Sequence, residues 1–326
     1  MDRDARPVTR IVFMGTPDFA VPALRALLDT SHFEVAGVVT QPDRPAGRGQ
    51  RVQMSPVKQV ALRASLPVIQ PLQAHEPAAL DQLHAWTPDF LVVVAFGQIL
   101  RQPVLDLPRI APINVHASLL PRWRGAAPIQ AAIRAGDRCT GITTMIMDAG
   151  LDSGPILLQD SIPIDPAETG QTLHDKLAPL GAQLLLHTLE WLLSGSISPH
   201  PQPDNSALIT HAPQLRREDG ALDWSASAIA IDRHVRAFTP WPGTFTTWNG
   251  RRLKVLAGFP STANLGLAPG QVASTDGTPL DGLGPLAVGT GSGVYLPLRL
   301  QLEGRQALSA EAFRNGAPDF VGSRLG

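Results

Sequence analysis

The chain has 326 residues, of which 44% are hydrophobic and 17% charged, and this size and composition predict two globular domains. Its formal net charge of −1 excludes a bulk-charge argument for nucleic-acid binding, so such a function must depend on local clusters. One cysteine, Cys139, excludes an internal disulfide and a zinc site of several cysteines, and no apolar run approaches the ~18 residues of a membrane helix. We therefore expect a cytoplasmic protein with no membrane partner, and we also expect it to be monomeric.

The first 193 residues alternate strand-like and helix-like segments. The run at residues 90–95 (FLVVVA) is apolar on both faces, as expected of a strand inside a parallel sheet. The alternation predicts βαβ units, and therefore an α/β domain with an open, doubly wound, mostly parallel, Rossmann-like sheet. The other expected strands are residues 10–14, 34–40, 113–116, 141–147 and 155–164, and the expected helices are residues 17–29, 55–63, 77–86 and 170–193.

A polar stretch with three prolines, residues 194–206, contains almost nothing apolar to bury. It predicts a linker between one domain at residues 1–193 and another at residues 207–326. Beyond the linker, one expected helix at residues 225–238 precedes short β-rich runs separated by glycine turns. This pattern predicts a small, OB-like β-barrel. Its expected strands are residues 244–248, 253–257, 286–290 and 294–300.

The common nucleotide and hydrolase motifs are missing from the sequence. The first expected strand leads into Gly15-Thr16-Pro17-Asp18, which lacks the G-x-G-x-x-G pattern of dinucleotide-binding domains. The chain also has no G-x-x-x-x-G-K-[ST], H-E-x-x-H or G-x-S-x-G pattern. The sequence therefore disfavours a dehydrogenase and the commonest nucleotide, zinc and serine mechanisms.

Three polar residues suggest acyl-transfer chemistry. Asn114 and His116 are two positions apart in an expected strand, so their side chains share a face at the carboxyl end where open α/β sheets bind ligands. An amide donor beside an imidazole suits a carbonyl oxygen that becomes negative during acyl transfer. Asp152, in a glycine-flanked loop 36 residues after His116, could reach the histidine and set its charge. The alternative is structural: a turn former, a half-buried histidine and a loop cap.

A basic segment, residues 41–51 (QPDRPAGRGQR), carries Arg44, Arg48 and Arg51 on a Gly/Pro-rich backbone that we expect to be too irregular for a helix or strand. Two interpretations are open from these residues alone. The segment is either a solvated loop or a basic arm whose arginines meet phosphates or an opened base pair. Lys58 could join this arm or lie on the surface of the helix that follows.

Two longer runs, INVHASLLPRWRGAAPIQ (113–130) and DAGLDSG (148–154), resemble the folate-dependent formyltransferases. Three further segments are similar to the branch of that family that acts on methionyl-tRNA: FMGTPDFAVPAL (13–24), TQPDRPAGRGQ (40–50) and AFTPWPGT (237–244). The resemblance extends from about residue 10 to the C-terminus, and the first of these runs is long and specific.

The resemblance implies transfer of a formyl group from the co-substrate 10-formyltetrahydrofolate to the α-amino group of initiator methionyl-tRNA, with no metal. Matched by position, the catalytic trio falls on Asn114, His116 and Asp152. The resemblance also implies that the basic segment enters the acceptor end of the tRNA, and we expect the C-terminal domain to contact the tRNA. The implied folate contacts are Ser118, Leu119, Leu120 and Pro121, and a pterin pocket around Phe96, Gly97, Gln98, Ile99 and Leu100.

Two alternatives to this function come from different classes. One is a formyltransferase that acts on a small amine, such as a nucleotide or an amino sugar; the basic segment and the second domain argue against it. The other is a protein that binds tRNA or folate without turnover, against which the intact Asn114, His116 and Asp152 argue.

Overall fold

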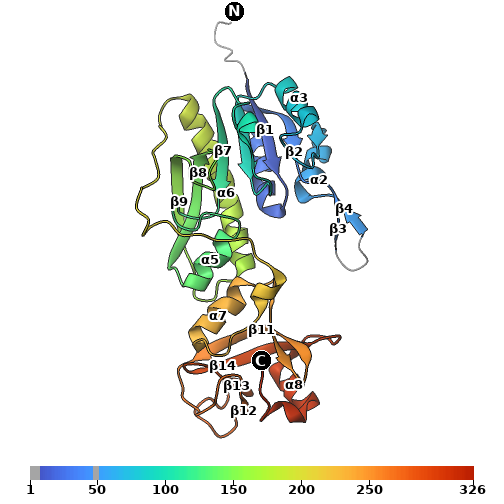
Figure 1. Ribbon diagram of the computed structural model, residues 1–326, viewed down its shortest axis with the longest axis vertical. Coiled ribbons are helices and arrows are strands. Elements are labelled where there is room, and N and C mark those ends of the chain that lie inside the picture. Colours follow the sequence, from blue (N-terminus) through green and yellow to red (C-terminus); the bar gives the residue numbers. More distant parts are fainter. Residues whose placement is uncertain (1–7, 47–50) are drawn as a thin grey trace, which may run out of the picture. The chain divides into compact units, whose positions relative to one another are not determined.

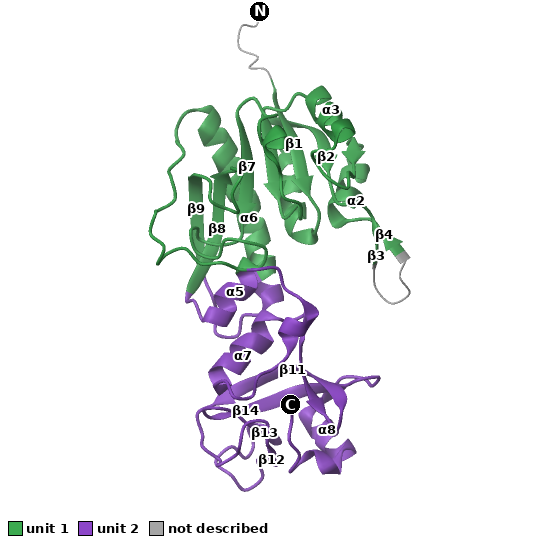
Figure 2. Ribbon diagram, in the orientation of Figure 1, with its two compact units in different colours: residues 1–128, 139–162, 174–212 green, residues 129–138, 163–173, 213–326 purple. Residues whose placement is uncertain are grey.

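A computed structural model describes residues 8–46 and 51–326, so Arg48 lies outside the described residues (Figure 1). The chain divides by packing into two compact units (Figure 2). Residues 139–162 and 174–212 pack with the chain up to residue 128 in unit 1, and residues 129–138 and 163–173 pack with residues 213–326 in unit 2. This division describes packing, and the assignment of separate functions to residues 1–193 and 207–326 stays a prediction.

Unit 1 is built on a seven-stranded sheet in the order β5-β2-β1-β6-β7-β8-β9. Its strands are β1 (Thr9–Gly15), β2 (Phe33–Val39), β5 (Val68–Ile69), β6 (Phe90–Val94), β7 (Ala111–His116), β8 (Cys139–Ile146) and β9 (Ile156–Pro163). The strands from β5 to β7 pair in parallel, and β8 pairs with β7 in the antiparallel direction. The predicted α/β class, with a doubly wound and mostly parallel sheet, is confirmed.

The central strands lie where the sequence is apolar on both faces, because such strands are stable only inside a sheet that is covered on both sides. All five residues of β6 are buried, and so are the last five of β1. Helix α2 follows from local chemistry: the Ser55 hydroxyl accepts from the Lys58 N–H, and Pro56 starts the helix. The helices of this part of the chain are α1 (Val21–Leu28), α2 (Pro56–Arg63), α3 (Pro77–Ala85), α4 (Gln102–Leu105), α5 (Pro128–Ala135) and α6 (Gly170–Leu193).

The strand order places a topological switch between β1 and β6. From β1 the chain builds outward through β2 to β5, and it then returns to the other side of β1 with β6 and β7. Ligands of open α/β sheets bind outside the carboxyl ends of the strands at such a point. The carboxyl end of β6 leads directly into residues 96–100, the predicted pterin-binding segment.

Two segments expected to lack regular pairing are paired. Within the basic segment, β3 (Arg44–Ala46) and β4 (Arg51–Gln53) form a separate two-stranded antiparallel ribbon, so the expectation of an irregular backbone is wrong at these ends. Pro45 is tolerated because both edges of a two-stranded ribbon are open. The expected linker at residues 194–206 also packs with unit 1, where His200 and Ile156 exchange two backbone hydrogen bonds of 2.8 Å.

Unit 2 contains a six-stranded sheet in the order β10-β11-β14-β13-β12, with β15 paired to β14, and its strands pair in the antiparallel direction. The strands are β10 (Thr244–Trp248), β11 (Arg251–Ser261), β12 (Val272–Ser274), β13 (Leu286–Gly289), β14 (Val294–Leu302) and β15 (Leu308–Ser309), with helices α7 (Ala228–Ala237) and α8 (Ala310–Gly316). The core contains five large aromatic side chains, Trp224, Trp248, Tyr295, Phe313 and Phe320.

The C-terminal residues close the sheet of unit 2 toward a barrel. Val272 in β12 donates to the carbonyl of Ser323 at 2.9 Å, and Gly326 donates to the carbonyl of Thr247 in β10 at 3.1 Å. The chain end therefore bridges the two outer strands of the sheet, which fits the predicted OB-like barrel. Over the part of the chain that the structure describes, no helix is both long enough and apolar enough to span a membrane.

Candidate active site

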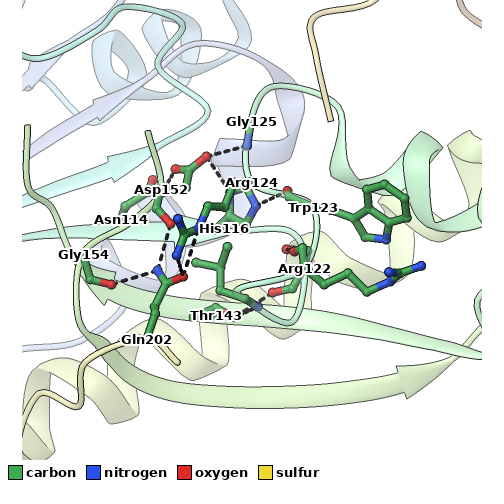
Figure 3. A network of polar contacts seen from close by, with 12 residues as sticks. Asn114, His116, Arg122, Trp123, Arg124, Gly125, Thr143, Asp152, Gly154 and Gln202 are labelled. Carbon is green, nitrogen blue, oxygen red and sulfur yellow. Dashed lines mark hydrogen bonds and ion pairs between the residues drawn. The ribbon is translucent and has the colours of Figure 1, made fainter. Parts of the chain in front are cut away.

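The structure brings Asn114, His116 and Asp152 together (Figure 3). Asn114 and His116 lie on the carboxyl half of β7, and Asp152 lies in the loop between β8 and β9. Asn114 Nδ2 donates to Asp152 Oδ1 at 3.4 Å, and His116 Nδ1 lies 3.6 Å from Asp152 Oδ2. The His116 and Asp152 side chains are only 6% and 15% exposed. Three residues that are separated in the sequence thus form one compact polar group.

Backbone and side-chain contacts fix Asp152. Its φ of 50° is in the left-handed region, which is uncommon for a residue other than glycine, although aspartate adopts it more often than most. The N–H of Gly125 donates to Asp152 Oδ2 at 2.8 Å, and Gln202 Nε2 donates to the Asp152 carbonyl at 2.8 Å. Gly154 is equally constrained, because a Cβ there would lie 1.9 Å from the carbonyl oxygen of Ile146. The aspartate is therefore held in place before any substrate binds.

His116 lies between two hydrogen-bond acceptors. Its Nε2 is 2.9 Å from the carbonyl oxygen of Trp123, and its Nδ1 faces the Asp152 carboxylate. A neutral imidazole has one N–H and satisfies one acceptor, whereas an imidazolium has two and satisfies both. Both ring nitrogens of His116 face an acceptor. To donate to a substrate oxygen, Nε2 has to exchange the Trp123 carbonyl for that oxygen.

The predicted folate contacts 118–121 form a turn that is hydrogen-bonded to its neighbours. The Ser118 hydroxyl donates to the Arg122 carbonyl at 2.5 Å, and the Thr143 hydroxyl donates to the Ser118 carbonyl at 2.6 Å. Leu120 is buried, donates its N–H to Thr143 Oγ1 at 3.1 Å, and precedes a cis peptide bond to Pro121. Leu119 is partly buried. This turn directly follows His116, so it flanks the catalytic trio.

The second predicted folate segment lies at the topological switch point. Phe96 and Leu100 are buried, whereas Ile99 is 83% exposed. Gly97 has a φ of +84°, which favours glycine, and the amide of Gln98 binds the backbone on both sides, at Ala74 N and Pro71 O. The segment thus combines an anchored backbone with an exposed apolar side chain, which suits the flat face of a pterin.

The predicted tRNA contacts differ in their surroundings. Arg44 is exposed on β3 and donates to Gln41 Oε1 at 3.3 Å, and Arg51 begins β4 in the same ribbon. Lys58 is mostly buried and forms an ion pair of 2.6 Å with Asp43. Arg48 cannot be placed, since it lies outside the described residues. The sequence left open whether Lys58 joins the basic arm, and the structure separates it from the others by pairing it with Asp43.

Sequence reasoning missed Gln202. Its Nε2 also donates to the Gly154 carbonyl at 2.9 Å, and its Oε1 accepts from Arg124 at 2.6 Å. Gln202 therefore ties the Asp152 loop to the segment that follows Pro121. It stands in the proline-rich stretch that predicted a linker, where no pattern distinguished it. Among the described residues, no group of three or more His, Cys, Asp or Glu is placed to hold a metal ion.

Comparison with known proteins matches residues 9–189 to the formyl transferase family and residues 214–318 to the C-terminal domain of formyl transferases. The chain is 46% identical to a methionyl-tRNA formyltransferase of Geobacter sulfurreducens over 317 residues, which cover 97% of this chain and 96% of that protein.

Among solved structures, the fold is similar to HypX from Aquifex aeolicus in complex with tetrahydrofolic acid, with a TM-score of 0.63, 16% identity, and coverage of 97% of this chain and about half (48%) of that one. It is also similar to a methionyl-tRNA formyltransferase from Clostridium thermocellum, with a TM-score of 0.55, 14% identity, and coverage of 78% and 95%.

Proposed function

This chain belongs to the formyl transferase family, and from that membership we propose that it transfers the formyl group of 10-formyltetrahydrofolate to the α-amino group of initiator methionyl-tRNA. The observation that carries the proposal is the meeting of Asn114, His116 and Asp152 at the carboxyl end of β7, in a chain similar to methionyl-tRNA formyltransferases along nearly its whole length. The product is N-formylmethionyl-tRNA, which serves translation initiation. 10-Formyltetrahydrofolate is the co-substrate.

In the proposed reaction the free amine of the methionyl group attacks the formyl carbon directly. A C–N bond forms, the carbonyl oxygen becomes an oxyanion, and the bond from the formyl carbon to N10 then breaks. Asn114 supplies an amide N–H to that oxyanion, and the positive charge of His116 stabilises it further. A donor of this kind contributes ~3 kcal/mol to transition-state stabilisation.

Asp152 has two roles: it orients His116, and it relays a proton from the attacking amine toward N10. Its carboxylate faces His116 Nδ1, so it orients the ring and keeps it charged. During the reaction the attacking amine loses a proton and N10 gains one, and Asp152 relays this proton, directly or through water. A well-placed proton relay raises the rate by ~10²–10⁴.

The tRNA is met by the basic segment, through Arg44, Arg48 and Arg51, and by the C-terminal domain. Arginine suits this role because its planar fork donates two hydrogen bonds to a phosphate or a base edge. The folate is held by Ser118, Leu119, Leu120 and Pro121, and by the segment Phe96, Gly97, Gln98, Ile99 and Leu100. We also propose that the enzyme is monomeric and cytoplasmic, and sedimentation of the active protein checks the monomer.

A formyl-transfer assay with three acceptors tests the function. Initiator methionyl-tRNA, elongator methionyl-tRNA and a nucleotide-linked amino sugar are compared with the same folate donor. We expect efficient formylation of the initiator tRNA and little or none of the sugar. Preference for the sugar would indicate a small-amine formyltransferase, and folate or tRNA binding without any product would indicate a binding protein.

A further inference from the structure

Lys58, expected to extend the basic segment, is already paired inside unit 1. Its Nζ lies 2.6 Å from Asp43 Oδ2 and 2.6 Å from Gln70 Oε1, and its side chain is only 16% exposed. Gln70 Nε2 closes the triangle by donating to Asp43 Oδ1 at 2.8 Å. Hydrogen bonds from Lys58 and Gln70 lower the pKa of the Asp43 carboxyl, so this group is ionised at neutral pH. Lys58 is therefore half of an ion pair rather than a free cation.

This triangle fixes both ends of the chain between residues 41 and 54. Asp43 precedes β3, Lys58 lies in the first turn of α2, and Gln70 follows the edge strand β5. Gln70 Nε2 also donates to the backbone carbonyl of Gln41 at 2.8 Å. The entry to the basic segment and the helix that follows it are thus tied to the same point at the edge of the sheet.

Gln41 connects the basic segment to the predicted folate-binding segment. Its Nε2 donates to the Phe96 carbonyl at 3.3 Å, and its Oε1 accepts from the Arg44 guanidinium at 3.3 Å. Its backbone N–H donates to Thr16 Oγ1 at 3.3 Å, and that hydroxyl donates to the same Phe96 carbonyl at 2.9 Å. One carboxamide therefore contacts a predicted tRNA-binding arginine and the first residue of the predicted pterin-binding segment.

We propose that Gln41, Asp43, Lys58 and Gln70, here called the root cluster, are positioning residues that hold the basic segment and couple it energetically to the folate site. The proposal rests on the proposed function, since it assumes that both substrates bind at these segments. A folate bound against the segment that begins at Phe96 also restricts the Gln41 carboxamide, which bonds to the Phe96 carbonyl, and through it the Arg44 side chain. The tRNA then meets an Arg44 side chain that is already positioned, which lowers the entropic cost of its binding. Thermodynamic linkage requires that tRNA strengthen folate binding by the same factor.

Equilibrium binding tests this coupling without turnover, because tetrahydrofolate has no formyl group to transfer. For the full 326-residue chain, we compare the affinity for initiator methionyl-tRNA with and without saturating tetrahydrofolate. We expect the ratio of the two affinities to be roughly five or more. Gln41→Met, similar in length but unable to bridge, should bring this ratio to within about twofold of one. The matched control Gln102→Met removes an exposed amide that donates to Asp106 on α4, and it should keep the wild-type ratio.

The coupling is overturned if wild-type tRNA affinity is the same with and without tetrahydrofolate, or if Gln41→Met keeps the wild-type ratio. These results differ from a failure of the proposed function. An enzyme that formylates no methionyl-tRNA refutes the function, whereas normal formylation with a ratio of one refutes only the coupling.

Salt dependence tests the position of Lys58 in the root cluster. If Lys58 is an anchor, Lys58→Met raises the KM for tRNA but leaves the slope of log affinity against log salt unchanged. Loss of a direct phosphate contact would instead lower that slope by about one. Asp43→Asn, which keeps the shape of the side chain and therefore favours folding, should raise the KM in the same way, and the double variant should be no worse than the worse single variant.

Two results would overturn the anchor and assign Lys58 to the tRNA interface. One is a reduced salt slope in Lys58→Met. The other is tighter tRNA binding in Asp43→Asn, where Lys58 would be released from its partner charge.

Discussion

The catalytic trio and the basic segment are built in contrasting ways. Asn114 and His116 lie on a buried strand of a seven-stranded sheet, and Asp152 is held by hydrogen bonds to its carboxylate and to its carbonyl. The basic segment carries β3 and β4, which pair only with each other, and its Arg44 is exposed. One region is fixed by the core, and the other extends from it on a narrow ribbon.

The contrast follows from what each region has to recognise. Bond formation needs donors placed accurately before the substrate arrives, because reorganisation during the reaction would raise the barrier. A polyanion is met by exposed arginines whose attraction acts over several ångströms and is screened by salt. We therefore expect substitutions in the trio to change the rate of chemistry, and substitutions in the segment to change tRNA binding and its salt dependence.

The largest expected effect is that of Asp152→Asn. The amide keeps the shape of the side chain and can still accept from Gly125, but it removes the charge that faces His116 and ends the proton relay. We expect the turnover number to fall roughly a hundredfold or more, with an unchanged thermal unfolding midpoint. Steady-state formylation of methionyl-tRNA and calorimetry measure the two quantities.

Asp148→Asn is the matched control for Asp152. Asp148 is an exposed carboxylate in the same loop, where it accepts from Ser153 at 2.9 Å and from the Gly150 N–H at 3.0 Å. We expect its turnover to stay within about threefold of wild type, because it contacts neither His116 nor Asn114. Turnover of Asp152→Asn within threefold of wild type would refute the role of Asp152.

Asn114→Ala should lower the rate of chemistry about a hundredfold while leaving folate affinity almost unchanged, because its contact to the oxyanion strengthens mainly in the transition state. Single-turnover formylation at saturating folate measures the first quantity, and equilibrium titration measures the second. Asn205→Ala, an exposed asparagine that accepts from the Ala207 N–H, serves as the control. Weak folate binding with a normal single-turnover rate would make Asn114 a binding residue only.

Local patterns were sufficient to predict the framework of this protein. Period-two spacing placed Asn114 and His116 on one face, and two-sided apolar runs identified the central strands. Strand order is not contained in such patterns, but the preference for βαβ crossovers supplied the doubly wound class. The approach of Asp152 to His116 was predicted from its place in a loop after a neighbouring strand, and the structure brings the two side chains to 3.6 Å.

The features that sequence analysis missed depend on contacts between distant residues. Gln202 joins the site only because the chain after α6 runs back along β9, and nothing in its neighbours indicates that path. Lys58 resembles any surface lysine until Asp43 and Gln70 fold against it. The C-terminal residues that bridge β10 and β12 have no pattern of their own, since their pairing is set by those strands.

Arg48→Ala tests the basic segment, the second of the two regions compared. Arg48 stands between Gly47 and Gly49 in the sequence, outside the described residues, and a guanidinium can donate two hydrogen bonds to a phosphate or a base. We expect a loss of ~1–3 kcal/mol in kcat/KM for methionyl-tRNA, with folate binding unchanged. The salt slope of tRNA binding should decrease if the contact is to phosphate and stay constant if it is to a base.

The control for Arg48 is Arg63→Ala, which removes an exposed arginine from the last turn of α2. Equal tRNA kinetics for Arg48→Ala and wild type, at both low and physiological salt, would make the basic segment a solvated connector. The residues that bind tRNA would then have to lie in the C-terminal domain.

The smallest expected effect, that of Gln202→Leu, asks how much of the fixed geometry of the trio comes from its supporting contacts. The substitution removes donors to the Asp152 and Gly154 carbonyls and the acceptor for Arg124, while Gly125 still holds the Asp152 carboxylate. Because Asp152 has a positive φ, which is uncommon for a residue other than glycine, loosening this loop should misplace the carboxylate in a fraction of molecules.

We therefore expect Gln202→Leu to lower kcat about tenfold or less, with the KM for tRNA unchanged, since a displacement of the order of an ångström in a catalytic group reduces rate rather than binding. Gln102→Leu, at an exposed position of α4, should change neither constant. A raised KM with normal kcat would instead place Gln202 among the tRNA contacts. The stretch at residues 194–206 would then serve tRNA binding, like the basic segment. In that case a residue that hydrogen-bonds to catalytic Asp152 would itself belong to the binding region.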